Sequence, residues 1–271
     1  MNLEKELTMK THDHHHDQTE QLNAAWEKSQ QNEIIEYLNA GGKLAGQIEK
    51  VPGFTEALNR QLDTLDCSDG RVVSGAKMGL AGEGIVADEK EKEILAAELI
   101  RRREELGRKL TITGHEGCGA AALMHPGPDS DKYGYQGAEQ LATQTGNEYL
   151  AVSHAEFKSP VHNERALLLE CTGRFDAANW ENFPPQFISS APAFKLGDAY
   201  LKKEMPALTG IALSDHGLGA RFTVENPFYI IISANDQTEL DHLTSLAEET
   251  LKDFGNRVKI DGFIAPAEKK D

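Results

Sequence analysis

The chain has 271 residues, 39% of them hydrophobic and 27% charged, which is the balance of a globular protein and not of a disordered one. Its formal net charge of -16 argues against binding to nucleic acid or to anionic membrane surfaces, because both need clustered Lys and Arg. No apolar stretch is long enough to cross a membrane and no secretory signal opens the chain, so we expect a cytoplasmic protein. Three cysteines, an odd number, favour thiols that serve metal or chemistry over a disulfide framework.

The first residues differ in character from the rest of the chain. We expect residues 1–45 to form a tail and a helical extension, and residues 46–271 to form one α/β domain. The tail carries the run His12-Asp13-His14-His15-His16-Asp17, which is either a tract that collects metal ions, a solvated polar tail or an added tag. Residues 19–38 show a weak helical pattern that ends at Gly41-Gly42, with apolar marks at Leu22, Trp26, Ile34 and Leu38.

Short apolar runs then alternate with amphipathic helices. The clearest helix is predicted from Asp88, which can cap it together with Glu91, to Leu106, and Gly107 ends it. A second helix follows Asp236, with Leu240, Leu243, Leu251 and Phe254 on its buried face. The predicted strands are Leu62–Cys67, Leu110–Thr113, Tyr149–Ser153, Ala166–Cys171, Leu208–Leu213, Phe228–Ser233 and Val258–Ile264. This alternation predicts an α/β fold with a mostly parallel central sheet flanked by helices, and no internal repeat is evident.

Two segments combine residue types that carry chemistry: Cys67-Ser68-Asp69-Gly70-Arg71 and Gly114-His115-Glu116-Gly117-Cys118-Gly119. Each follows a predicted strand, and the long helix lies between them. Open parallel sheets bind their ligands beyond the carboxyl ends of their strands, so both segments are expected at one edge of the sheet.

The ligand types in these segments suit a zinc ion. Cys67, His115 and Cys118 offer two thiolates and one imidazole, which leaves a fourth tetrahedral position open, as in catalytic zinc sites. His115 and Cys118 are three residues apart, and a thiolate at a helix start has a lowered pKa. Bound zinc lowers the pKa of water to about 7. Asp69 can accept a hydrogen bond from that water, and Arg71 can keep Asp69 ionised and oriented.

Several other residues have simpler explanations. Both site cysteines could be small buried hydrophobic residues, and we expect Cys171 to be a buried strand cysteine. The segment Gly79–Gly84 lacks the glycine spacing of a phosphate-binding loop and is interpreted as a tight loop beside the metal site. Four histidines could move protons but are more simply structural or exposed, so none is assigned to catalysis: His125, His154, His162 and His216.

The two segments together resemble the zinc site of β-class carbonic anhydrases. The resemblance implies that Cys67, His115 and Cys118 bind zinc, that Asp69 and Arg71 form a catalytic pair, and that the reaction is the reversible hydration of carbon dioxide to bicarbonate. Asp69-Gly70-Arg71 followed by Gly75-Ala76-Lys77-Met78 is also similar to the ζ class, a diatom group able to use cadmium. Cadmium and cobalt are therefore expected substitutes for zinc.

The resemblance also bears on assembly and on rival activities. β-class enzymes usually dimerise through N-terminal helices, so residues 19–38 are candidates for a homodimer contact. Carbon disulfide and carbonyl sulfide hydrolases keep the same ligands, which leaves hydrolysis of either gas as an alternative. A non-enzymatic zinc protein is a further alternative, although zinc binding alone requires neither Asp69 nor Arg71.

Overall fold

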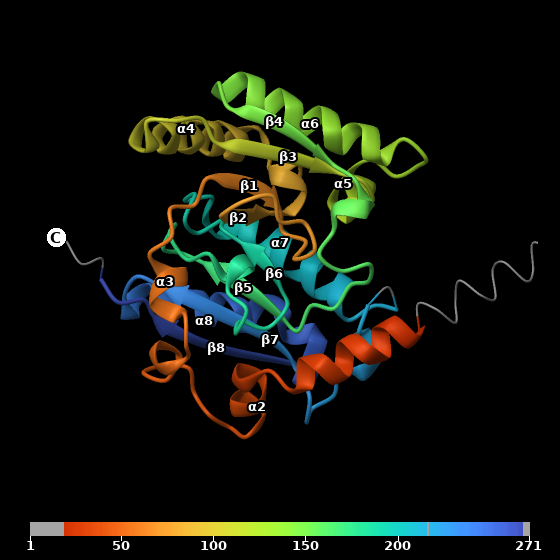
Figure 1. Ribbon diagram of the computed structural model, residues 1–271, viewed down its shortest axis with the longest axis vertical. Coiled ribbons are helices and arrows are strands. Elements are labelled where there is room, and N and C mark those ends of the chain that lie inside the picture. The colour runs from red at the N-terminus through yellow and green to blue at the C-terminus, as the bar shows by residue number, and fades with distance from the viewer. Residues whose placement is uncertain (1–18, 216, 268–271) are drawn as a thin grey trace, which may run out of the picture.

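The computed structural model describes residues 19–215 and 217–267, so the tract His12–Asp17 and His216 lie outside the described residues. Within these ranges the chain forms two four-stranded, fully parallel sheets flanked by helices (Figure 1). The predicted α/β class and the parallel strand direction are confirmed. The expected single central sheet is replaced by two sheets.

The first sheet has the strand order β2-β1-β3-β4 and the second has the order β6-β5-β7-β8. The strands are β1 Thr64–Cys67, β2 Lys77–Leu80, β3 Thr111–His115, β4 Glu148–Val152, β5 Ala166–Glu170, β6 Gln186–Ser189, β7 Phe228–Ala234 and β8 Val258–Ile264. The labelled α-helices are α2 Glu33–Asn39, α3 Phe54–Leu58, α4 Glu89–Leu106, α5 Gly119–Met124, α6 Ser130–Thr145, α7 Gly197–Ala212 and α8 Gln237–Leu251. Short 3-10 turns are η1 Ile48–Lys50, η2 Ala81–Gly84, η3 His154–Glu156, η4 Ala177–Asn179, η5 Gly219–Arg221 and η6 Lys252–Arg257.

The two halves of the chain share one topology. In each half the first strand lies between the second and the third, and the fourth strand forms the far edge. The halves meet where β2 approaches β6: the Ser190 backbone N–H donates to the Gly79 carbonyl over 2.7 Å. A Cβ on Gly79 would lie 2.5 Å from the carbonyl oxygen of Ile188, so only glycine permits this approach. The sequence shows no repeat, but the topology repeats.

The signals at helix ends were reliable guides to the helices. Asp88 caps α4, its side chain accepts from the Glu91 backbone N–H, and Glu91 completes the capping box. Gly107 ends the helix with a positive φ of 63°. Asp236 caps α8, and its side chain accepts from the Glu239 backbone N–H. The weak pattern over residues 19–38 forms two helices instead of one, because Asn32 caps α2 after a helix over residues 19–30.

One predicted strand is wrong and two strands were missed. The run Leu208–Leu213 forms the end of α7 and the residue after it, with Leu208, Thr209 and Ala212 buried on one face. A short apolar run does not distinguish a buried strand from a buried helical segment by its periodicity. The missed strands, β2 and β6, have only four residues each, all buried. The other six predicted strands agree with the structure within two residues at each end.

In the part of the chain that the structure describes, no helix is both long and apolar enough to cross a membrane.

Arg165 is fully buried at the start of the second half, without an anionic partner among the described residues. Its three guanidinium nitrogens make no hydrogen bond there, and its charge lies 4.1 Å from the ring centre of Trp26 and 5.2 Å from that of Phe222. Burial lowers the pKa of Arg165 to about 10. Removing the charge from water costs several kcal/mol. Contact with the two aromatic rings offsets only about 2 kcal/mol of that cost.

We therefore expect Arg165→Met to stabilise the protein. Methionine keeps the contact with both rings and removes the buried charge, so the free energy of unfolding should rise by about 1–3 kcal/mol. Urea unfolding measures the change. Arg221→Met, at a half-buried arginine bonded to Asn23, is the matched control and should change stability by less than about 0.5 kcal/mol. A less stable Arg165→Met variant would contradict this account.

Candidate metal centre

Three residues with metal-binding side chains meet at the carboxyl ends of two neighbouring strands. Cys67 ends β1, His115 ends β3, and Cys118 is the residue directly before α5. β1 and β3 pair in parallel, with Leu65 opposite Ile112, so both strands end at the same edge of the sheet. One ligand atom from each of the three residues lies within 4.8 Å of the other two, and all three residues are buried. The structure thus brings together the three ligands expected from the sequence, and this group could hold a metal ion.

The ring of His115 is oriented as a metal ligand would be. Its Nδ1 lies 2.8 Å from the backbone oxygen of Glu116, and because a carbonyl only accepts, Nδ1 carries the hydrogen. Its Nε2 is buried and makes no hydrogen bond with any described residue. A buried nitrogen lone pair without a partner is unfavourable unless it binds a cation or a proton. The backbone contact therefore fixes the tautomer in which Nε2 is free for a metal.

The two sulfur atoms are crowded together, which favours a cation between them. The Cys118 thiol lies within hydrogen-bonding reach of Cys67 and, against the effect of burial, lowers the pKa of Cys67 well below its usual range. The same contact raises the pKa of Cys118. Burial would lower the pKa of His115, but the negative charge of Cys67 raises it to about 10. A divalent cation would replace these protons and neutralise the second thiolate, so the donor set fits a metal.

The segment Gly79–Gly84 lies beside this cluster, as predicted, but Gly79 and Leu80 belong to β2 and only Ala81–Gly84 form a tight turn. The backbone N–H of Gly82 donates to Sγ of Cys67 over 3.3 Å. Glu83 follows with a positive φ of 53°, a strained conformation for a residue with a side chain, and its Oε1 is buried with no hydrogen-bond partner among the described residues. Burial raises the pKa of Glu83 well above its usual value, which favours the neutral acid.

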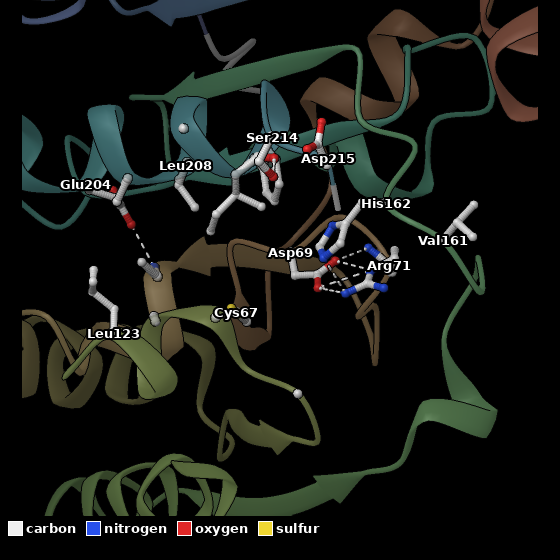
Figure 2. A pocket seen from close by; sticks show the side chains of 18 of the residues that line it. Cys67, Asp69, Arg71, Leu123, Val161, His162, Glu204, Leu208, Ser214 and Asp215 are labelled. Carbon is white, nitrogen blue, oxygen red and sulfur yellow. Dashed lines mark hydrogen bonds and ion pairs between the residues drawn. The ribbon is translucent and has the colours of Figure 1, made fainter. Parts of the chain in front are cut away.

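Asp69 and Arg71 form a two-point ion pair next to the cluster (Figure 2). Arg71 donates from Nε to Oδ1 over 3.0 Å and from Nη2 to Oδ2 over 2.6 Å, and its backbone N–H donates to Oδ1 over 2.9 Å. Burial would raise the pKa of Asp69, but the hydrogen bonds and charge of Arg71 hold it well below its usual range. Asp69 is therefore ionised at neutral pH, with its orientation set by Arg71.

The turn between these two residues is held by buried groups from elsewhere. A Cβ on Gly70 would lie 2.0 Å from the backbone oxygen of Gln186, so the turn passes directly against β6. The ammonium of Lys77 is fully buried and donates to the carbonyls of Asp69 and Val72 over 2.6 and 2.7 Å. Lys77 thus anchors the backbone that carries the ion pair.

A cavity of about 940 Å³ opens at this edge of the first sheet, and Cys67, Asp69 and Arg71 all line it. Figure 2 shows the ion pair at one side of the cavity, with Leu208 of α7 and Leu123 of α5 on opposite walls. Apolar side chains dominate the lining, among them Val86, Val161, Phe187 and Ile211. Cys67 of the three-ligand cluster and the Asp69–Arg71 ion pair therefore face one apolar cavity.

Two acid–base residues at the cavity were not assigned from the sequence. Glu204 of α7 is buried, accepts from the Ala81 backbone N–H over 2.7 Å and from Ser68 Oγ over 3.2 Å, and burial raises its pKa to about 7. His162 lines the cavity and contacts Arg71. No local pattern marks either residue, because their partners are far away in the sequence.

Cys171 is a buried cysteine in the second half, as predicted, and burial raises its pKa.

A scan against models of known protein families, a search of curated proteins and a search of solved structures each find no significant match to this chain. These comparisons therefore give no support to the expected family, and the structure itself supports an α/β fold with a possible metal site at Cys67, His115 and Cys118.

Proposed function

We propose that this protein binds a zinc ion through Cys67, His115 and Cys118 and catalyses the reversible hydration of carbon dioxide to bicarbonate. The observation that carries the proposal is a three-ligand cluster beside the Asp69–Arg71 ion pair, with Cys67 and the ion pair lining the same cavity. Two sulfurs and one imidazole nitrogen suit zinc, with cadmium or cobalt as substitutes. A purely structural zinc site would not need the ion pair.

Each group of the chain has a distinct part in the proposed reaction. Bound zinc would supply an activated water, because it lowers the pKa of that water to about 7. Asp69, kept ionised, accepts a hydrogen bond from the attacking water and so aligns it with the carbon of the substrate. Arg71 can only donate, so it holds Asp69 in this orientation and does not compete for the proton. The apolar walls formed by Leu208 and Leu123 suit a substrate without charge or dipole.

Stopped-flow hydration of carbon dioxide by zinc-loaded protein tests the proposal. Protein stripped of metal by a chelator is the control and should show no turnover above buffer. Carbonyl sulfide and carbon disulfide are assayed side by side at the same enzyme concentration. Hydration that depends on zinc supports the proposal. Negligible hydration beside rapid turnover of either sulfur-containing gas would replace it with hydrolysis on the same site, and no turnover of any gas would favour a non-enzymatic zinc protein.

The remaining expectations from the sequence belong to this proposal. Its only substrates are small molecules, carbon dioxide and bicarbonate, and the compartment is the cytoplasm. A homodimer through residues 19–38 is part of the same proposal. Analytical ultracentrifugation of the full chain distinguishes a dimer from a monomer.

A further inference from the structure

A histidine from the second half of the chain reaches the ion pair of the first half. His162 precedes β5, and its Nε2 lies 2.8 Å from Nη2 of Arg71. Its other ring nitrogen, Nδ1, lies 3.2 Å from the nearer carboxylate oxygen of Glu164, a buried residue. In Figure 2 the ring of His162 lies directly beside the carboxylate of Asp69 and the guanidinium of Arg71. Four side chains are thus linked in one sequence of contacts: Asp69, Arg71, His162 and Glu164.

The chemistry of the groups determines the direction of each hydrogen bond. A guanidinium can only donate, so Nε2 of His162 must accept from Arg71. In the unprotonated ring the hydrogen is on Nδ1, where the carboxylate of Glu164 accepts it. Burial lowers the pKa of His162, but the hydrogen bond and charge of Glu164 raise it overall, so this arrangement belongs to the pH range above that raised pKa. Glu164 therefore selects the tautomer that allows His162 to bind Arg71. A metal-binding histidine is oriented in the same way: one ring nitrogen donates to a carboxylate and the other binds the metal. Here the guanidinium of Arg71 takes the place of the metal.

The surroundings leave Arg71 few other positions. Oxygen and nitrogen atoms of Asp69, His162 and Glu164 lie within 4.8 Å of one another, a grouping that could hold a cation. Arg71 already provides the cation there, because it bonds both Asp69 and His162. The ring of Phe157 lies 5.1 Å from the guanidinium carbon. The group is therefore a binding site for a side-chain cation and not for a second metal.

We propose that His162 and Glu164 are positioning residues that hold Arg71, and through it Asp69, in the geometry needed for the reaction. This inference rests on the proposed role of Asp69 and Arg71 in hydration. This role explains why residues 160–164 lie so close to the half of the chain that carries Cys67, His115 and Cys118. Without His162, one N–H of the guanidinium would lose its acceptor, and Arg71 could leave the two-point contact with Asp69.

The test uses His162→Leu, which fills a similar volume but accepts no hydrogen bond. We expect kcat/KM for hydration to fall about 10–100-fold, mostly in kcat, with zinc content unchanged. His162→Gln retains an acceptor oxygen and should recover part of the loss, and Glu164→Gln should give an intermediate loss. His242→Leu is the matched control, because His242 contacts Asp198 over 2.9 Å on the exposed surface of α8. This control should behave as wild type.

A second measurement does not depend on activity. The NMR signal of the Arg71 side-chain Nε–H should exchange slowly with water in the wild type, because Nε is bonded to Asp69. In His162→Leu the exchange should become at least several-fold faster, with or without zinc, and in His242→Leu it should not change. An unchanged Arg71 signal in His162→Leu would overturn the proposal.

A double-mutant comparison separates positioning from a direct role. If His162 acts through Arg71, adding His162→Leu to Arg71→Leu should cause no further loss of hydration. An equal loss in both backgrounds would show that His162 acts independently, which also overturns the proposal. If the wild type hydrates no carbon dioxide, the proposed function fails, whereas the exchange of the Arg71 signal still decides whether His162 holds Arg71.

Discussion

Cys67→Ser should leave the protein folded but without bound zinc and without hydration activity. Structural zinc sites contribute about 10–16 kcal/mol of binding free energy, so the loss of one of three ligands should cost ~4 kcal/mol, about 10³-fold in affinity. A serine hydroxyl stays protonated at neutral pH and is a poor zinc ligand. Metal analysis of protein dialysed against a weak chelator measures the stoichiometry, which should fall from one zinc per chain to none.

Cys171→Ser is the matched control for this substitution. Cys171 is also buried after a parallel strand, but it belongs to the second half and does not belong to the three-ligand cluster. The Cys171→Ser variant should retain one zinc per chain and the wild-type hydration rate. A Cys67→Ser variant that keeps one tightly bound zinc would show that the metal is bound elsewhere and would contradict the assigned ligand set.

Asp69→Asn should lower the hydration rate by about 10²–10⁴-fold at unchanged zinc content. The amide cannot serve as the anionic acceptor that aligns the attacking water, and it also leaves the guanidinium of Arg71 without its ion-pair partner. Stopped-flow hydration and metal analysis on the same sample separate the two effects. Asp198→Asn, on the exposed side of α7, is the control and should keep full activity. An Asp69→Asn variant with the wild-type rate would remove Asp69 from the mechanism.

The depressed pKa of Asp69 also predicts the pH behaviour of the fold. In the folded state Arg71 keeps the pKa of Asp69 below that of an unfolded aspartate. Its ionised form therefore contributes stability at every pH above the unfolded pKa, and this contribution is lost only as the pH falls through the depressed value. Between pH 5 and 8 Asp69 stays ionised, so the protonation of Asp69 should not limit activity in that range.

The grouping of Cys67, His115 and Cys118 at one edge of the sheet could be predicted from the sequence because the signals for the strand ends are local. Cys67 and His115 each end a short, mostly buried strand, and the strands predicted over Leu62–Cys67 and Leu110–Thr113 end within two residues of them. The ends of α4 were predictable for the same reason, since Asp88 and Gly107 act on the adjacent turn of helix.

The rest of the site depends on contacts between distant segments. His162 lies 91 residues from Arg71, and Glu204 lies 136 residues from Ser68, so no spacing rule connects them. The strands β2 and β6 have only four residues each, which is too short for an apolar pattern to be identified. These two strands are the edges at which the two sheets approach each other. A single sheet was expected because the position of a sheet edge follows from pairing, which sequence periodicity does not report.

X-ray absorption spectroscopy of the zinc-loaded protein examines the metal centre on which the proposed activity depends. The account predicts two sulfur ligands at about 2.3 Å and two lighter ligands at about 2.0–2.1 Å, one of them the imidazole of His115 and the other an exchangeable water. Addition of an anion such as thiocyanate should replace that water and change the spectrum. A shell that contains four protein ligands, or one with fewer than two sulfurs, would contradict the open three-ligand site.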